Sequence, residues 1–182
     1  MAVNNRVLVT GGAGFIGSHL VDELVREGYK VTVLDNLSTG RIENIEHQLE
    51  KEEFHLIGGD VRDREDVEEA LKGVEAVFHL AAIISVPYSV KYPKVTYEVN
   101  VDGTRNLLEA CLRKDVGRFV YISTCAVYGE PKYLPIDEDC PPNPISPYAE
   151  SKLKAEELCM NFYEDYGLKT VILRPFNVYG PR

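Results

Sequence analysis

The chain has 182 residues, and 45% of them are hydrophobic, which is enough to build the core of one globular domain. Its formal net charge of −9 argues against nucleic acid and anionic membranes as partners, because both carry negative charge themselves. The 4 cysteines lack C-x-x-C spacing, and there is no signal peptide or membrane-length apolar run, so we expect a reduced, cytoplasmic protein. The 4 histidines are scattered without ligand spacing, so no metal site is predicted.

The first predicted element is a strand over Arg6–Thr10, a short run rich in β-branched and aliphatic residues. A glycine-rich turn follows, and helical spacing then resumes. Gly12, Gly14 and Gly17 fit the pattern G-x-G-x-x-G, and Gly11, Gly14 and Gly17 fit the variant T-G-x-x-G-x-x-G. Between a strand and a helix, this pattern is typical of a loop that binds the pyrophosphate of a dinucleotide. The alternative is a plain glycine-rich turn.

In a dinucleotide-binding loop the glycines have separate tasks. The first pair allows a sharp turn at positive φ. Gly14 lets the backbone approach a pyrophosphate with no Cβ in the way, and Gly17 lets the helix pack close to the strand. The helix start at Phe15 and Ile16 offers free N–H groups and a positive dipole end to the phosphates.

A second strand is predicted over Lys30–Asp35, and it ends on an acid. Asp35 lies close to the distance beyond the glycines at which a dinucleotide fold places the carboxylate that binds both ribose hydroxyls of NAD. That carboxylate would repel the extra phosphate of NADP, so NAD is favoured. Arg41 is the only nearby cation that would accommodate NADP, and the alternative for Asp35 is a loop aspartate without a ligand.

Strand and helix patterns continue to alternate along the chain. The predicted strands cover residues 6–10, 30–35, 54–57, 76–80, 118–122 and 169–173, and the predicted helices cover 18–27, 64–71, 95–111 and 148–166. Residues 42–53 are predicted as a poorly packed helix or loop, and 83–92 and 133–147 as loops. This alternation predicts an α/β fold, a Rossmann-type doubly wound parallel sheet of about six strands with helices on both faces.

Ligands of such sheets bind at the carboxyl ends of the strands. The residues predicted to share that rim are Gly11–Gly17, Asp35, Asp60, Ala81, Thr124, Tyr148 and Phe176. Asp60 is placed to meet an adenine edge. Asn100 interrupts the apolar pattern of the helix over 95–111, and it is either an exposed amide or an anchor for the active-site loops; the sequence leaves both open.

Tyr148 and Lys152 stand four residues apart at the start of a predicted helix, so both project from the same face. A free tyrosine has a pKa of about 10, and bringing it near 7 requires about 4 kcal/mol in favour of the phenolate. One cation at about 4 Å supplies roughly that energy at an effective dielectric of about 20. Lys152 is such a cation, an oxidised nicotinamide would be a second, and Ser123 and Thr124 offer a hydroxyl to relay the proton.

Several motifs together resemble the extended short-chain dehydrogenase/reductase superfamily: TGGAGFIGSHL, the Asp35 strand end, Gly59-Asp60-Val61, HLAA, STCAVYG, SPYAESK and LRPFNVYGPR. Within it the chain is similar to the NAD-dependent epimerase/dehydratase family, most of all to sugar-nucleotide epimerases of the UDP-glucose 4-epimerase kind. The resemblance covers essentially the whole chain.

The resemblance implies a role for each matching residue. Tyr148 is the catalytic base, Lys152 is its partner and also holds the nicotinamide ribose, and Thr124 is the catalytic Ser/Thr. The implied NAD-binding residues are Gly11, Gly14, Phe15, Ile16, Gly17, Asp35, Asn36, Asp60, Val61, Leu80, Ala81, Ala82, Asn100, Ser123, Tyr148, Lys152 and Phe176. Asn177 begins the substrate site, which also includes Thr124 and Tyr148.

The implied reaction is reversible oxidation of a nucleotide sugar, a UDP-hexose. Tyr148 as phenolate takes the proton of the sugar 4-hydroxyl through or beside Thr124, and the C4 hydride passes to NAD. The 4-keto sugar then turns over, and the hydride returns to its other face. Relatives that dehydrate sugars carry Asp-Glu where this chain has Cys125-Ala126, which disfavours dehydratase activity. No base is placed for Cys125, so we interpret it as a small buried residue.

Relatives continue beyond the GPR motif into a smaller substrate domain. We therefore expect residues 1–182 to form one NAD-binding domain, with 174–182 starting the substrate region and the remainder absent, as a fragment or a short form. Such a chain should hold NAD and turn over UDP-sugars slowly or not at all. The alternatives are a non-catalytic NAD(H)-sensing module and another NAD(P)-dependent relative: a dehydratase, decarboxylase or reductase. The helices over 95–111 and 148–166 are compatible with a homodimer.

Overall fold

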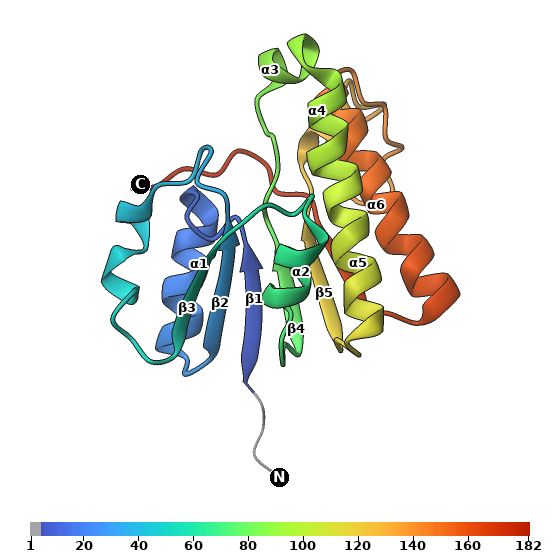
Figure 1. Cartoon of the computed structure of the whole chain (residues 1–182). Coiled ribbons are helices and arrows are strands. Elements are labelled where there is room, and N and C mark those ends of the chain that lie inside the picture. Colours follow the sequence, from blue (N-terminus) through green and yellow to red (C-terminus); the bar gives the residue numbers. More distant parts are fainter. Residues whose placement is uncertain (1–4) are drawn as a thin grey trace.

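Six short apolar runs form a single parallel sheet in the computed structural model, which describes residues 5–182. The strands are β1 (Arg6–Thr10), β2 (Lys30–Asp35), β3 (Phe54–Gly58), β4 (Ala76–His79), β5 (Arg118–Ile122) and β6 (Thr170–Leu173). Their order is β3-β2-β1-β4-β5-β6, and every neighbouring pair is parallel (Figure 1). The Rossmann-type sheet predicted from the sequence is confirmed.

Helices cover both faces of this sheet, as predicted. On one face, α1 (Phe15–Arg26) and the 3₁₀ turns η1 (Ile42–Asn44) and η2 (Glu46–Gln48) pack on the strands β1 to β3. On the other face lie α2 (Arg64–Ala70), α5 (Gly103–Arg113) and α6 (Pro147–Tyr166). The second face holds the larger core, in which Leu8, Leu107 and Phe119 are fully buried.

Capping residues fix the ends of α6. The Ser146 hydroxyl accepts a hydrogen bond from the Ala149 N–H at 3.2 Å, and Pro147 occupies the first turn, where its missing N–H costs nothing. Gly167 ends the helix at φ +71°, a conformation that favours glycine. The helix therefore starts at a defined residue, which fixes the positions of Tyr148 and Lys152.

The predicted helix over 95–111 is three consecutive pieces rather than one regular helix. They are α4 (Pro93–Tyr97), the π-helical turn η3 (Glu98–Asp102) and α5. A π-helical turn shifts the side-chain positions, and such turns are frequent at functional sites. Here Asn100 lies in that turn and is buried.

A predicted loop and a region predicted as a poorly packed helix or loop both contain more order than the sequence indicates. Residues 83–92 contain the helix α3 (Val86–Lys91), which has Ser85 as its N-cap and Pro87 in its first turn, where a proline is compatible with a helix as well as with a loop. The poorly packed region predicted over 42–53 contains Ile45, which is fully buried against the core of the α1 face. The loop prediction is wrong, because the Ser85 cap and the proline in the first turn allow a short helix whose side chains are mostly exposed. The second region is a pair of 3₁₀ turns with mostly exposed residues, as a poorly packed helix would be, except that long-range packing buries Ile45.

The sheet is not covered evenly. Ile172 of β6 packs against the core beneath α6, so its neighbours Val171 and Leu173 point to the opposite face, where they are 45% and 47% exposed. Among residues 5–182, no helix has the length and apolar character needed to cross a membrane.

The segment after β6 returns across the carboxyl ends of the strands. In Figure 1 this red segment runs from β6 to the side of α1. There the Pro181 carbonyl lies 3.0 Å from His19 Nε2, and Arg182 pairs with Asp22. Residues 174–182 thus lie along the rim at which the predicted site residues gather.

Candidate functional site

The candidate site lies at the carboxyl ends of the neighbouring strands β1 and β4. The chain runs from β1 outward to β3, and then from β4 outward to β6, so this is the point at which the strand order reverses. Gly11, at φ +70°, leads out of β1, and a Cβ built on it would lie 2.8 Å from the Ala81 nitrogen. The glycine loop and the Leu80–Ala82 segment are therefore in contact, at the place where doubly wound sheets bind ligands.

The start of α1 leaves backbone donors without a partner side chain. Gly14 is the N-cap residue and provides no capping hydrogen bond, whereas the N-caps of α2 and α6 provide them through Asp63 and Ser146. The first N–H groups of a helix have no intrahelical acceptor. Those of Phe15 and Ile16, together with the helix dipole, are therefore suited to an anionic ligand such as a pyrophosphate.

Asp35 is tied to this loop. Its Oδ2 accepts a hydrogen bond from the Ala13 N–H at 2.9 Å, and its Oδ1 accepts one from the Leu37 N–H at 2.9 Å. The residue is 8% exposed, and each carboxylate oxygen keeps a lone pair for another donor. Its place at the end of β2, beside the glycine loop, is compatible with the predicted ribose contact.

Asn36 and Asp60 meet at the ends of β2 and β3. Asn36 Nδ2 donates to Asp60 Oδ2 at 2.9 Å, so two predicted adenosine-binding residues are in direct contact. The Arg62 guanidinium hydrogen-bonds to Asp60 and, against the opposing effect of burial, lowers the pKa of that carboxyl to about 2. The next residue, Val61, is buried, and its carbonyl accepts a hydrogen bond from Asn106 at 3.2 Å.

A buried chain of hydrogen bonds runs from the glycine loop to the π-helical turn. The Thr104 hydroxyl donates to the Asn100 carbonyl at 2.7 Å, so it accepts from His79 Nε2 at 2.9 Å. This assigns the Nε2–H tautomer of His79, whose Nδ1 then accepts from the Thr10 hydroxyl at 2.7 Å. Thr10 Oγ1 in turn accepts the N–H groups of Leu80 and Ala81, each at 3.2 Å.

Burial lowers the pKa of His79 from 6.5 to about 3, with a smaller contribution from Lys152, so the imidazole stays neutral in the folded protein. Below about pH 6.5 His79 binds a proton in the unfolded chain but stays neutral in the folded protein, so acid destabilises the fold. We expect the free energy of unfolding to fall by about 1.4 kcal/mol per pH unit between about pH 6 and 4.5. Urea denaturation across that range measures it.

His79→Gln removes this titration and should flatten the slope. His55→Gln, which changes an exposed histidine on β3, should leave the slope as it is in the wild type. An equal slope in wild type and His79→Gln would show that His79 is not the group that takes up the proton.

Asn100 is an anchor rather than an exposed amide, which decides between the two alternatives left open by the sequence. Its Oδ1 accepts the Ile83 N–H at 2.8 Å, and its Nδ2 donates to the Ile83 carbonyl at 3.0 Å and to Ser151 Oγ at 2.9 Å. Ser151 donates to the Tyr148 carbonyl at 2.7 Å. Asn100 therefore connects the loop after β4 to the backbone of Tyr148, and both of its N–H donors are occupied.

Tyr148, Lys152 and Thr124 come together where α6 passes the end of β5. Burial raises the pKa of the Tyr148 phenol, and the smaller, opposite effect of the nearby Thr124 hydroxyl does not cancel it. Lys152 is buried and donates to the Ile122 carbonyl at 2.6 Å, with Nζ 4.3 Å from the centroid of the Tyr121 ring. Burial lowers the pKa of Lys152 to about 7. The lowered tyrosine pKa expected from Lys152 is thus not seen in the chain alone.

Three further predicted residues differ in how they face the rim. Phe176 and Asn177 are exposed on the segment after β6. Ser123 is buried, and its hydroxyl donates to Glu156 on α6. Ser123 therefore serves the packing of α6 against β5 in this structure, and its predicted cofactor contact stays a prediction.

The sequence analysis missed two groups beside this site. Ser89 of α3 accepts the Tyr148 N–H at 3.1 Å, so α3 also holds the start of α6. The buried Glu156 forms an ion pair with the partly exposed Arg174, one turn along α6 from Lys152. Glu156 and Arg174 lie 18 residues apart on different elements, so local spacing does not indicate the pair.

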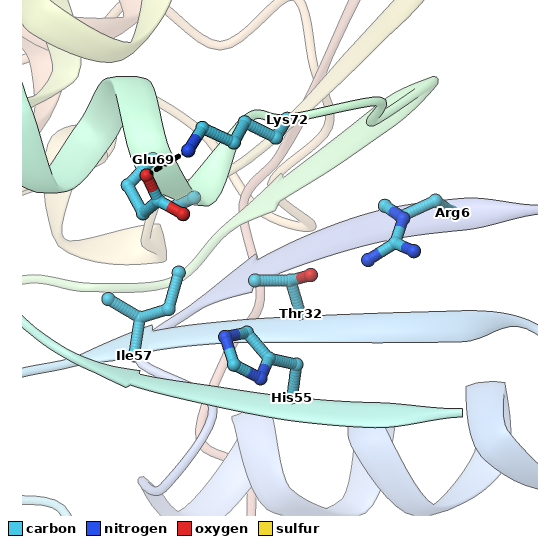
Figure 2. A pocket seen from close by; sticks show the side chains of 7 residues that line it. Arg6, Thr32, His55, Ile57, Glu69 and Lys72 are labelled. Atoms are coloured by element: carbon cyan, nitrogen blue, oxygen red, sulfur yellow. Dashed lines mark ion pairs between the residues drawn. The ribbon is translucent and has the colours of Figure 1, made fainter. Parts of the chain in front are cut away.

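A hollow of about 260 Å³ lies away from the rim, beside α2. Figure 2 shows its lining: Arg6, Thr32, His55, Ile57, Glu69 and Lys72. Thr32 and His55 are paired across β2 and β3, and Glu69 is ion-paired with Lys72. The lining mixes both charges and contains none of the predicted site residues. Among residues 5–182, no cluster of three or more His, Cys, Asp or Glu residues is arranged to hold a metal ion.

Comparison with known proteins decides the family. A family model described as the NAD dependent epimerase/dehydratase family matches residues 7–182. The chain belongs to this family. The match includes the glycine loop, the Asp35 strand end and the Tyr148–Lys152 helix, and the resemblance seen in the sequence is confirmed.

Family members similar to this chain differ in their reactions. It is 48% identical over 179 residues to a putative UDP-glucose 4-epimerase of Methanocaldococcus jannaschii, covering 97% of this chain and 57% of that protein. It is 42% identical over 183 residues to UDP-glucuronic acid decarboxylase 1 of Xenopus tropicalis, covering 97% and 42%. The structure of Thermus thermophilus UDP-glucose 4-epimerase in complex with NAD has a TM-score of 0.90 at 48% identity, covering 97% and 57%. The chain spans about half the length of the curated relatives it matches.

Proposed function

We propose that this chain binds NAD and carries the catalytic residues of a UDP-sugar 4-epimerase of the UDP-glucose 4-epimerase kind. The observation that carries the proposal is the convergence of Tyr148, Thr124 and Lys152 on the rim that holds the uncapped start of α1 and the Asp35 carboxylate. Sequence neighbours with that activity support it.

The residues at the carboxyl ends of β1, β2, β3 and β4 suit a dinucleotide. The N–H groups of Phe15 and Ile16 would hold the pyrophosphate, and Asp35 the adenosine ribose. Asn36, Asp60 and Val61 would border the adenine, and Leu80, Ala81 and Ala82 would border the cofactor beyond it. Lys152 would hold the nicotinamide ribose. NAD supplies a hydride acceptor that can return the hydride, so the cofactor is not consumed.

The chain's own residues would move the proton of the sugar 4-hydroxyl. The Tyr148 phenol has a raised pKa without ligands because burial disfavours its charge, so it needs nearby positive charge before it can act as a base. Lys152 and an oxidised cofactor would supply that charge. Thr124, whose hydroxyl lies near the phenol, would orient the sugar hydroxyl. Asn177 would begin the substrate site.

Decarboxylation is the second candidate, because a UDP-glucuronic acid decarboxylase is 42% identical to this chain. Both candidates belong to the same NAD-dependent family, so binding of NAD does not separate them. The Cys125-Ala126 pair after Thr124 disfavours a dehydratase.

A cytoplasmic location and a homodimer through α4–α5 and α6 stay predictions. Helix α6 exposes Met160, Tyr163 and Tyr166, which would suit such an interface.

The cofactor part of the proposal is tested by titration. The purified chain should bind NAD more tightly than NADP, because Asp35 accepts two ribose hydroxyls and repels a 2′-phosphate. Asp35→Ala should shift the NAD-to-NADP affinity ratio at least about tenfold toward NADP, on the order of one charge-assisted hydrogen bond. Isothermal titration calorimetry measures both affinities, and the ratio cancels the loss of the Ala13 anchor, which affects both cofactors.

An NADP preference in the wild type would overturn the assignment of that carboxylate. The sugar part is tested by adding UDP-glucose, UDP-galactose or UDP-glucuronic acid to the NAD-loaded chain at stoichiometric concentration. Reduction of NAD by the first two supports the 4-epimerase, and release of CO₂ from the third alone supports the decarboxylase.

A further inference from the structure

Two buried charges of α6 face the end of β5, one helical turn apart. Lys152 donates to the carbonyl of Ile122, and Glu156 accepts from the hydroxyl of the next residue, Ser123. The side chains at positions i and i+4 of a helix lie on the same face, so these two point into the same layer between helix and sheet. Lys152 is 3% exposed and Glu156 is 1% exposed, so neither charge is solvated by bulk water.

Glu156 is held by Ser123, at the end of β5, and by Arg174, just after β6. Arg174, just after β6, donates Nε to Glu156 Oε1 at 3.0 Å and Nη2 to Oε2 at 2.6 Å. Arg174 also donates Nη1 at 3.0 Å to the hydroxyl of Tyr128, which lies in the 3₁₀ turn η4 (Cys125–Tyr128) after Thr124. The carboxylate is thus saturated with donors and fixed between the helix that carries Tyr148 and the segments that carry Thr124 and Phe176.

We propose that Glu156 is the buried counter-charge that keeps the Lys152 ammonium protonated at the active site, and that Arg174 limits its strength by sharing the same carboxylate. The catalytic purpose of this counter-charge rests on the proposed function, since a neutral Lys152 could not stabilise a Tyr148 phenolate. Glu156 is in this sense a positioning residue: it acts through Lys152.

The other groups that face Lys152 do not supply a negative charge near neutral pH. They are His79 of β4, Tyr121 of β5 and Cys159 of α6. His79 is neutral, and burial raises the pKa of Tyr121. Burial also raises the pKa of the Cys159 thiol to about 12. Glu156 forms its ion pair with Arg174 and none with Lys152, so it opposes the effect of burial on Lys152 through space, as the carboxylate one turn along the same helix face.

The test uses two substitutions that should shift the titration midpoint of Lys152 in opposite directions. Glu156→Gln keeps the side-chain shape and removes the counter-charge, so the titration midpoint of Lys152 should fall by about one pH unit or more. Arg174→Gln leaves the carboxylate without its competing cation, so the midpoint should rise. The readout is the ¹³Cε chemical shift of Lys152 in the ¹³C-lysine-labelled whole chain across a pH series, with the signal assigned by Lys152→Arg.

Controls separate charge from packing. Glu157→Gln removes the adjacent, exposed carboxylate of the same helix and should leave the midpoint of Lys152 unchanged. Arg174→Lys keeps the charge while losing the two-point contact, and it should also leave the midpoint close to that of the wild type. Glu156→Gln and Arg174→Gln both break the ion pair and so both weaken the fold. If the pair were purely structural, the two substitutions would not move the titration midpoint of Lys152 in opposite directions.

A midpoint that stays unchanged in both variants, or moves in the same direction in both, overturns the proposal. If Glu156→Gln does not fold, the pair Arg174→Gln and Arg174→Lys still decides, since only the first should raise the midpoint. The measurement needs neither cofactor nor sugar, so its failure would leave the proposed epimerase function standing. Failure of the NAD and UDP-sugar experiments would equally leave this result intact.

Discussion

Replacing Gly17 with alanine should abolish dinucleotide binding and strongly destabilise the domain. A Cβ at this position would lie 2.1 Å from the carbonyl oxygen of Gly11 and 2.9 Å from the Cα of Gly12. These are backbone atoms of the turn itself, so no side-chain rotation relieves the collision. We expect a loss of about 3 kcal/mol in unfolding free energy and a fall of more than about a hundredfold in NAD affinity. Urea denaturation and calorimetry measure the two effects.

Gly117→Ala is the matched control. A Cβ on Gly117 would lie 3.5 Å from the Glu75 carbonyl oxygen, an ordinary van der Waals contact, at the opposite end of the sheet from the glycine loop. This variant should keep both stability and NAD binding. Wild-type NAD affinity in Gly17→Ala would mean that the close approach of α1 to the β1 turn is not what shapes the binding loop.

Tyr148→Phe should remove hydride transfer while keeping the cofactor. The phenol is the proton acceptor of the proposed reaction, and general bases contribute about 10²- to 10⁴-fold to rates. We expect the single-turnover rate of NAD reduction by UDP-sugars to fall at least about a hundredfold. We also expect NAD binding to raise a tyrosinate signal in the ultraviolet difference spectrum of the wild type, a signal that this variant lacks. The second readout does not depend on turnover.

Tyr163→Phe is the control for both readouts, because Tyr163 is an exposed tyrosine on the same helix. It should match the wild type. Equal rates of NAD reduction in Tyr148→Phe and wild type would exclude Tyr148 as the base. Unchanged behaviour of Tyr148→Phe in every assay, with NAD still bound, would favour a sensing module over an enzyme.

Local sequence is sufficient where one element and its neighbour carry the signal. The Arg6–Thr10 strand, the glycine turn and α1 are adjacent in the chain, so residue type and spacing predict them together. Asp35 follows from its place at the end of the next strand. The alternation of strands and helices then requires one common rim, because parallel strands all end at the same edge of the sheet.

Contacts between distant segments are beyond the sequence analysis. The sequence of α3 predicts a loop because Pro87 is also a turn signal, and only the packing of Ser89 against the start of α6 distinguishes the two. The inward direction of Asn100 depends on the π-helical turn, which residue spacing does not indicate. The ion pair of Glu156 and Arg174 joins α6 to the segment after β6, and a charged residue in a helix pattern normally predicts a solvent-exposed face.

The sequence by itself determined the six strands and the main helices as they follow one another along the chain, the glycine loop, and the residue types at the rim. Propensity, periodicity and glycine conformations act over a few residues, so local sequence is enough for these features. The tertiary structure alone decided the protonation environment of that rim. His79 is neutral, Lys152 has a lowered pKa, and Glu156 is buried one turn from Lys152. In each case, side chains from other elements exclude water from the group. Desolvation and charge pairing depend on distances in space, and these exist only once the sheet and its helices have assembled.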